Sequence, residues 1–96
     1  MELPKTMMIG KRRYTVVKTK KVSGTRHGAM YPTLRIIKVA LYDGKTPRKD
    51  ADVMETFWHE VTHAILYEMD SLLWDNEEFV TSFSASLNRC VLTSEF

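Results

Sequence analysis

The chain has little of several residue types, and each shortage excludes a class of protein. Its 96 residues include one cysteine, Cys90, so an internal disulfide is excluded and a reducing compartment is favoured. No apolar run approaches the roughly 20 residues that a membrane-spanning helix needs, and the first residues carry none of signal-peptide length. We therefore expect a cytoplasmic protein with no membrane partner.

Acidic residues are almost absent from the first half of the chain. Residues 1–49 hold 13 of the 14 lysines and arginines and two acids, whereas residues 50–96 hold one base and the other ten acids. The halves therefore carry net charges of +11 and −9. We prefer the interpretation that the halves attract each other in the fold. The alternative is a nucleic-acid-binding surface. Its candidate residues are Lys18, Lys20, Lys21 and Arg26.

The first half has the composition of β-strands. Residues 6–9 and 13–20 are apolar or β-branched in part, and residues 34–41 (LRIIKVAL) are the strongest strand prediction. Residues 20–28 are polar, include two glycines and predict a loop or an exposed hairpin. A small antiparallel or mixed sheet is therefore expected within residues 6–42.

The second half has the periodicity of helices. Residues 51–68, with Asp50 as the expected N-cap, carry apolar side chains at spacings of three and four. These are Met54, Phe57, Trp58, Val61 and Ile65. A second helix is expected over residues 76–92, preceded by a capping-box pattern of Asp75 and Glu78. Its expected core stripe is Val80, Phe83, Leu87 and Cys90 or Val91, with Phe79 at the edge.

These predictions define an α+β fold in a single domain, residues 1–96. The sheet is expected to pack on the first helix, with the second helix beside it. A chain of this length buries a small core, so a bound metal ion could contribute to folding stability as well as to chemistry.

The first predicted helix contains His59-Glu60-Val61-Thr62-His63, an H-E-x-x-H motif. Because a helix turns once in 3.6 residues, two histidines four residues apart project from one face and can bind one ion. That face lies almost opposite the apolar stripe, so the helix can pack on the sheet and still present both imidazoles. The glutamate between them is placed to accept a proton from water.

A catalytic Zn²⁺ site needs a third protein ligand beside His59 and His63. Glu77 and Glu78 at the start of the second predicted helix are the main candidates, and helical phase favours Glu77. For Glu77 to reach the histidines, the connector between the helices must fold back. The remaining candidates are Asp70, Asp75 and His27.

Three other features have functional interpretations. Tyr31 and Tyr67 are candidate hydrogen-bond donors to an oxyanion, although most tyrosines in small domains serve packing. The strand at residues 34–41 is a candidate surface for an extended peptide, if it lies at a sheet edge. Cys90, on the expected apolar stripe, is interpreted as a core residue.

Residues 55–65 (ETFWHEVTHAI) followed by residues 76–84 (NEEFVTSFS) resemble small phage-encoded zincin-like proteins, which are similar to the minimal gluzincin core of ImmA/IrrE-type metallopeptidases. The resemblance covers about residues 50–92. This chain has Thr62 where a glycine is frequent, and it lacks the Ala-Asn pair typical of the second helix. The resemblance implies that His59, His63 and Glu77 bind zinc and that Glu60 is the general base.

The function expected from the motif is zinc-dependent hydrolysis of a protein or peptide substrate. A zincin-fold module without catalytic activity, which contacts a host or phage protein in the host cytoplasm, is the first alternative. A basic nucleic-acid-binding protein is the second. The sequence specifies neither the substrate nor the oligomeric state.

Overall fold

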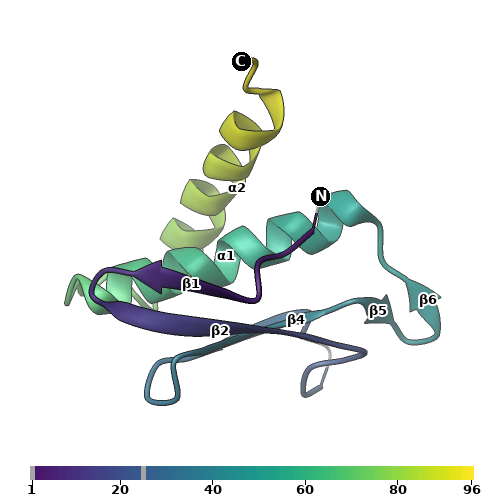
Figure 1. The fold of residues 1–96 in the computed structure, drawn as a ribbon, viewed down its shortest axis with the longest axis horizontal. Coiled ribbons are helices and arrows are strands. Elements are labelled where there is room, and N and C mark those ends of the chain that lie inside the picture. The colour runs from purple at the N-terminus through teal and green to yellow at the C-terminus, as the bar shows by residue number, and fades with distance from the viewer. Residues whose placement is uncertain (1, 25) are drawn as a thin grey trace.

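The structure, a computed structural model, describes residues 2–24 and 26–96 (Figure 1). They form a mixed four-stranded sheet, a short hairpin and two helices, which confirms the α+β prediction. The strands are β1 (Thr6–Ile9), β2 (Arg12–Thr19), β3 (Gly28–Tyr31), β4 (Ile36–Ala40), β5 (Tyr42–Asp43) and β6 (Thr46–Pro47). The helices are α1 (Asp50–Glu68) and α2 (Glu77–Thr93).

The order of strands across the main sheet is β1-β2-β4-β3. β2 and β4 run parallel, whereas the two outer pairs are antiparallel. The strand predicted at residues 34–41 is therefore central, and it is shorter than expected because Leu34 lies in an exposed turn. β3 forms one edge of the sheet and was not predicted, since its sequence Gly-Ala-Met-Tyr has no β-branched residue.

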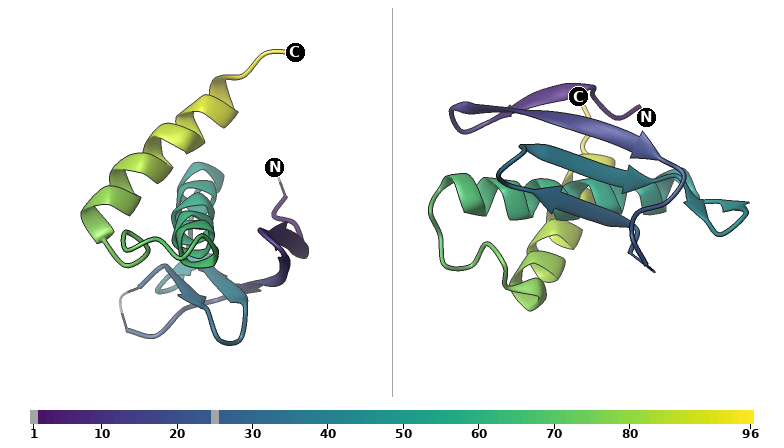
Figure 2. Two further views of the ribbon diagram at one scale, coloured as in Figure 1. Left: turned by 90° about the vertical axis from the view of Figure 1, so that its left-hand side faces the viewer. Right: turned by 90° about the horizontal axis from the view of Figure 1, so that it is seen from below.

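α1 lies across one face of the sheet, and α2 packs on α1 from the side away from the sheet (Figure 2). The core between sheet and helix is apolar. The sheet contributes Ile9, Tyr14, Val16, Ile37 and Val39, and α1 contributes Val53, Met54, Phe57, Val61 and Ala64. Ile65 was predicted to belong to this core but is 37% exposed. The Tyr14 hydroxyl donates to Glu68 Oε2 at 2.7 Å and so links β2 to the last turn of α1.

Arg48 ties the other end of α1 to the sheet. Its Nη1 donates to the carbonyl oxygen of Ala40, at the end of β4, at 2.7 Å. Its Nη2 donates to the Asp52 carbonyl oxygen at 3.1 Å and to Thr56 Oγ1 at 2.7 Å, both on α1. One side chain thus fixes the first half of the helix against the sheet, because hydrogen bonds from a charged donor are among the strongest in proteins.

Both helices match their predicted ranges within a residue, but their caps differ from the prediction. α2 is capped by Asn76, whose Oδ1 accepts from the Phe79 backbone N–H at 3.0 Å, so the proposed Asp75–Glu78 capping box is wrong. The N-cap of α1 is Lys49, which makes no side-chain cap bond, and Asp50 is the first helical residue. In the described ranges of the chain, neither helix has the length and apolar character needed to cross a membrane.

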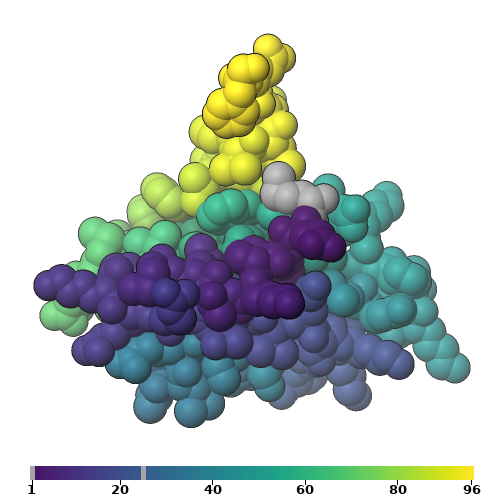
Figure 3. All heavy atoms as spheres, in the orientation of Figure 1, coloured from purple at the N-terminus to yellow at the C-terminus, as the bar shows by residue number. Residues whose placement is uncertain are grey.

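The buried face of α2 differs from the predicted stripe. Val80, Ser84 and Asn88 are buried, whereas Phe83 is 49% exposed and Cys90 is exposed. The prediction of Cys90 as a core residue is therefore wrong. The reason is the packing of α2, which has α1 as its main neighbour, while its C-terminal half stands out from the body (Figures 1 and 3).

Candidate metal centre

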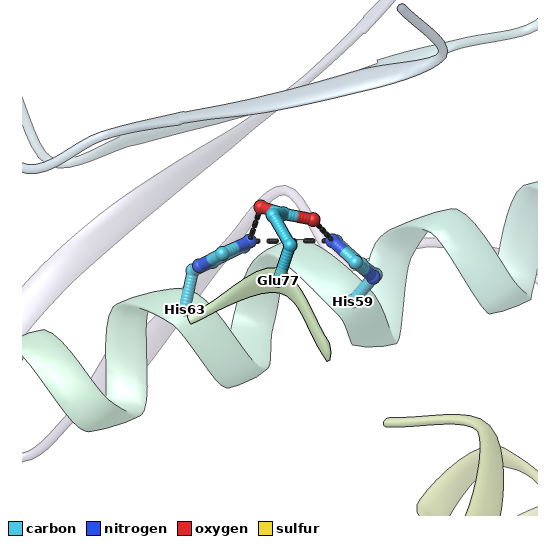
Figure 4. A group of neighbouring side chains, drawn as sticks. All are labelled: His59, His63 and Glu77. Carbon is cyan, nitrogen blue, oxygen red and sulfur yellow. Dashed lines mark hydrogen bonds and ion pairs between the residues drawn. The ribbon is translucent and has the colours of Figure 1, made fainter. Parts of the chain in front are cut away.

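The two histidines and Glu77 come together from different helices. His59 and His63 lie one turn apart on α1, and Glu77 is the first residue of α2 (Figure 4). The connector folds back as the prediction requires. Asp70 adopts a positive φ of 57°, and the Ser71 N–H donates to the Leu66 carbonyl oxygen at 2.9 Å, which reverses the chain at the end of α1.

Glu77 faces α1 because of its position in the helix. It precedes Val80 by three residues and Ser84 by seven, and both of these are buried. Residues at such spacings share one face of a helix. Both Glu77 and Glu78 are exposed, but Glu78 lies one position around the helix and does not belong to the group that could hold a metal ion.

The ring nitrogens of the two histidines and the two oxygens of Glu77 lie close enough together to surround a small cation. His59 Nε2 lies 3.2 Å from His63 Nε2 and 3.1 Å from Glu77 Oε2. His63 Nε2 lies 2.7 Å from Glu77 Oε1. A tetrahedral zinc ion with ligands at its usual bond lengths separates them by roughly 3.3 Å. The residues present therefore fit a zinc ion with small adjustments of the side chains.

The orientation of His63 is fixed by the backbone of the connector. Its Nδ1 lies 2.6 Å from the carbonyl oxygen of Trp74. A carbonyl oxygen only accepts, so Nδ1 carries the hydrogen and donates it. In the neutral ring, Nε2 then presents a lone pair toward Glu77 and His59. A histidine ligand held by a hydrogen bond from its second ring nitrogen is the usual arrangement at protein metal sites.

The electrostatics of His59 also favour a ligand. Burial lowers the pKa of His59, although the nearby carboxylate of Glu77 opposes this effect. Burial disfavours the charged imidazolium. A neutral imidazole is the form that binds a metal ion.

Glu60 lies beside the three ligands and points toward β3. Glu60 is only 6% exposed. Burial raises the pKa of its carboxyl to about 7, whereas the nearby His63 acts to lower this pKa. A buried carboxyl disfavours its charged form, which explains the sign of the shift. A pKa near neutrality suits a group that accepts and returns a proton.

Gly28 allows β3 to approach this carboxyl. A Cβ at position 28 would lie 2.6 Å from Cγ2 of Thr56 and 2.9 Å from Oε2 of Glu60. Both contacts are closer than carbon and oxygen atoms tolerate, so only glycine fits between the strand and the helix without movement.

A cleft of about 940 Å³ opens from this centre along α1. Its walls are the start of β3 with the two residues before it, the β5–β6 hairpin and the first half of α1. A second pocket of about 180 Å³ lies on the His63 side, lined in part by Met30 and Trp74. The position between the imidazoles and Glu77 thus has free space on two sides.

The other predicted ligands do not join the two histidines and Glu77. His27 is 3.8 Å from Asp43, Asp75 lines the small pocket, and Asp70 belongs to the reversed connector. In the described residues, the group that could hold a metal ion consists of His59, His63 and Glu77.

Neither tyrosine proposed as an oxyanion donor belongs to the centre. Tyr31 pairs with Ile36 across the sheet, and Lys38 Nζ lies 5.4 Å from the centre of its ring. The ring of Tyr67 packs edge-on against Trp74, with ring centres 5.3 Å apart. The proposed peptide surface on residues 34–41 is also wrong, because β4 is hydrogen-bonded to β2 and β3 on its two sides.

Sequence reasoning missed three contributors to the centre. Trp74 acts through its carbonyl oxygen, which no sequence pattern reveals. Gly28 acts by lacking a side chain, and the glycine before an apolar strand was the available signal. Arg26 lines the centre, although the sequence suggested it only as part of a basic surface.

Comparison with known proteins adds no family to this description. The chain matches no protein family, no curated protein and no solved structure. The assignment of the centre therefore rests on its geometry and on the chemistry of its residues.

Proposed function

We propose that the chain is a zinc-dependent peptidase with a minimal zincin-type centre. The observation that carries this proposal is the convergence of His59 Nε2, His63 Nε2 and the Glu77 carboxylate. The two nitrogens are 3.2 Å apart, Glu77 Oε2 lies 3.1 Å from His59 Nε2, and Glu77 Oε1 lies 2.7 Å from His63 Nε2. The lone pairs of neutral imidazoles and of a carboxylate repel one another unless a cation or a shared proton lies between them. Two imidazoles and one carboxylate with space on the open side form the donor set of many catalytic zinc sites.

The ion would supply Lewis-acid polarisation of a carbonyl group and would lower the pKa of a water molecule toward neutrality. The remaining work is done by side chains of the chain itself. His59, His63 and Glu77 hold the ion, and the Trp74 carbonyl oxygen keeps the His63 ring in its binding orientation. Glu60 accepts a proton from the attacking water and delivers it to the leaving amine.

The substrate is an extended peptide in this proposal, bound along β3. This strand is at the sheet edge, and the cleft lies between its start and the first half of α1. An edge strand has unpaired backbone groups that can hydrogen-bond a peptide as an added strand. Such binding holds the peptide backbone near Glu60, which lies close to Gly28 of β3.

The experiment is a digest of a peptide library by the zinc-loaded protein, read by mass spectrometry. We expect the Glu60→Gln variant to keep one zinc per chain and to cleave roughly 10²–10⁴-fold more slowly, the usual contribution of general acid–base catalysis. The matched control is Glu55→Gln, which removes an exposed carboxylate of the same cleft five residues earlier on α1. The control should cleave within a few-fold of the wild type.

Equal cleavage by wild type and Glu60→Gln would remove Glu60 from the mechanism. Zinc uptake without cleavage of any library peptide would instead favour a zincin-fold binding module. The two outcomes are distinguished because metal content and cleavage are measured on the same samples.

A further inference from the structure

Arg26 lies at the junction of the two cavities that flank the centre. The large cleft and the small pocket share three lining residues, which are Arg26, Glu60 and Glu77. Two of these belong to the proposed catalytic machinery, as base and as metal ligand. The third is an exposed arginine two residues before Gly28, the residue of β3 that meets Glu60.

The guanidinium of Arg26 has no carboxylate partner among the residues that the structure describes. The carboxylates that lie near a basic side chain there are Asp43, next to His27, and Glu77, next to His59 and His63. The contrast with Arg48 is informative, because that guanidinium donates three hydrogen bonds within the fold. Arg26 therefore keeps its donors free for a ligand.

Its charge lies beside the centre. Arg26 lines both cavities together with Glu60 and Glu77, so a ligand bound at the centre would meet the guanidinium. Peptide-bond hydrolysis places negative charge on the carbonyl oxygen of the substrate as water attacks, and this oxygen is the anion that a cation at the centre would contact.

No tyrosine or further histidine of the described chain takes that role. Tyr31 lies beneath Lys38, Tyr67 packs on Trp74, and His27 is paired with Asp43. Arg26 thus remains as the cationic donor that borders both cavities beside Glu60.

We propose that Arg26 is the anion-binding residue of this centre and donates hydrogen bonds to the negatively charged oxygen of the substrate as the peptide bond is attacked. A guanidinium presents several donors in one plane and stays charged at all working pH values, which suits an anionic oxygen. This inference rests on the proposed function, since it names a further residue of the same site.

The test is calorimetric binding of a phosphinic analogue of Ala-Ala to the zinc-loaded protein. The analogue has tetrahedral geometry and anionic oxygens, as the attacked carbonyl does. We expect Arg26→Gln to weaken its binding about 10- to 100-fold, the usual effect of losing a charge-assisted hydrogen bond. Arg26→Lys should recover part of the loss. Binding of imidazole, a neutral zinc ligand, should be the same in all variants.

The matched control is Lys49→Gln, which removes a positive charge from the large cleft but not from the small pocket. It should change affinity for the analogue by less than about threefold, as expected for a solvated charge at a distance. The inference is overturned if Arg26→Gln binds the analogue as the wild type does, or no worse than Lys49→Gln. It is also overturned if the zinc-loaded wild type does not bind the analogue.

These results are separable from the fate of the proposed function. Glu60-dependent cleavage with unchanged analogue binding in Arg26→Gln would reject Arg26 alone. Arg26-dependent binding with no cleavage in the library digest would reject peptide hydrolysis and leave Arg26 as an anion-binding residue beside the metal.

Discussion

Gly28 is the residue at which β3 and α1 come closest, and its lack of a side chain positions Glu60. A Cβ there would stand 2.6 Å from Cγ2 of Thr56. We predict that Gly28→Ala destabilises the protein by roughly 1–3 kcal/mol, the usual cost of overpacking, measured by urea unfolding. The strand or Glu60 must also shift, so cleavage should fall.

A second substitution tests the cause of that loss. Thr56→Ser removes the obstructing methyl group and keeps the hydroxyl that accepts from Arg48. In the Gly28→Ala background it should restore part of the stability. Equal stability of Gly28→Ala and the wild type, or no recovery with Thr56→Ser, would show that the close approach is not rigid.

For single residues, the sequence predicted those positions in the site that depend only on spacing along one helix. The four-residue step between His59 and His63 fixes their common face in any helix, and the structure has them together. The placement of Glu77 beside them depended on the connector, so helical phase favoured it over Glu78 without deciding between them. The Trp74 carbonyl oxygen and the free guanidinium of Arg26 depend on tertiary structure and left no pattern in the sequence.

Among the elements, α1 contributes side chains to both the hydrophobic core and the candidate metal centre. The position of α1 on the sheet therefore affects the stability of the core and the geometry of the centre. Arg48 holds its first half through bonds to Ala40, Asp52 and Thr56. Removing the guanidinium leaves partly buried acceptors without their donor.

We therefore predict that Arg48→Met lowers the free energy of unfolding by roughly 1–3 kcal/mol, measured by denaturant titration of the metal-free protein. The neighbouring exposed Lys49→Met should change it by less than about 0.5 kcal/mol. Similar values for the two variants would mean that the three hydrogen bonds contribute little.

The predictions of helices and strands were correct where the apolar residues recur with a strong helical or strand period. The predicted buried face of α2 was wrong, because the packing of one helix on another selects that face. Both helices and the strands β1, β2 and β4 were predicted near their observed positions. The stripe on α2 was misjudged because Phe83 and Cys90 follow the apolar pattern, while the face against α1 is formed by Val80, Ser84 and Asn88. Small and polar side chains suffice for a contact between two helices, and periodicity alone does not show which face makes it.

In the whole molecule, basic residues gather in the strand-forming half and acidic residues in the helical half. The predicted attraction between these halves does not take the form of direct pairs. Within residues 2–24 and 26–96, no lysine or arginine pairs with a carboxylate, and the basic side chains in contact with carboxylates are histidines. Complementary charges in separate layers still attract at longer range, although salt screens this attraction.

The nucleic-acid alternative stays a prediction. Lys18 lines a third pocket, of about 300 Å³, with Val53 of α1. Lys20 and Lys21 follow β2, and Arg26 borders the candidate metal centre. True phosphate contacts would give a steep loss of affinity with salt in a binding titration.

The central claim is that one divalent ion binds between the two helices. The most direct measurement is a calorimetric zinc titration of the wild type, His63→Ala, Glu77→Gln and Glu78→Gln at one pH. We predict one tight site in the wild type and in Glu78→Gln, and a loss of affinity of at least about 10- to 100-fold in the other two, as for lost members of a metal site. A wild type with no saturable site, or a Glu78→Gln variant as weak as Glu77→Gln, would contradict the account.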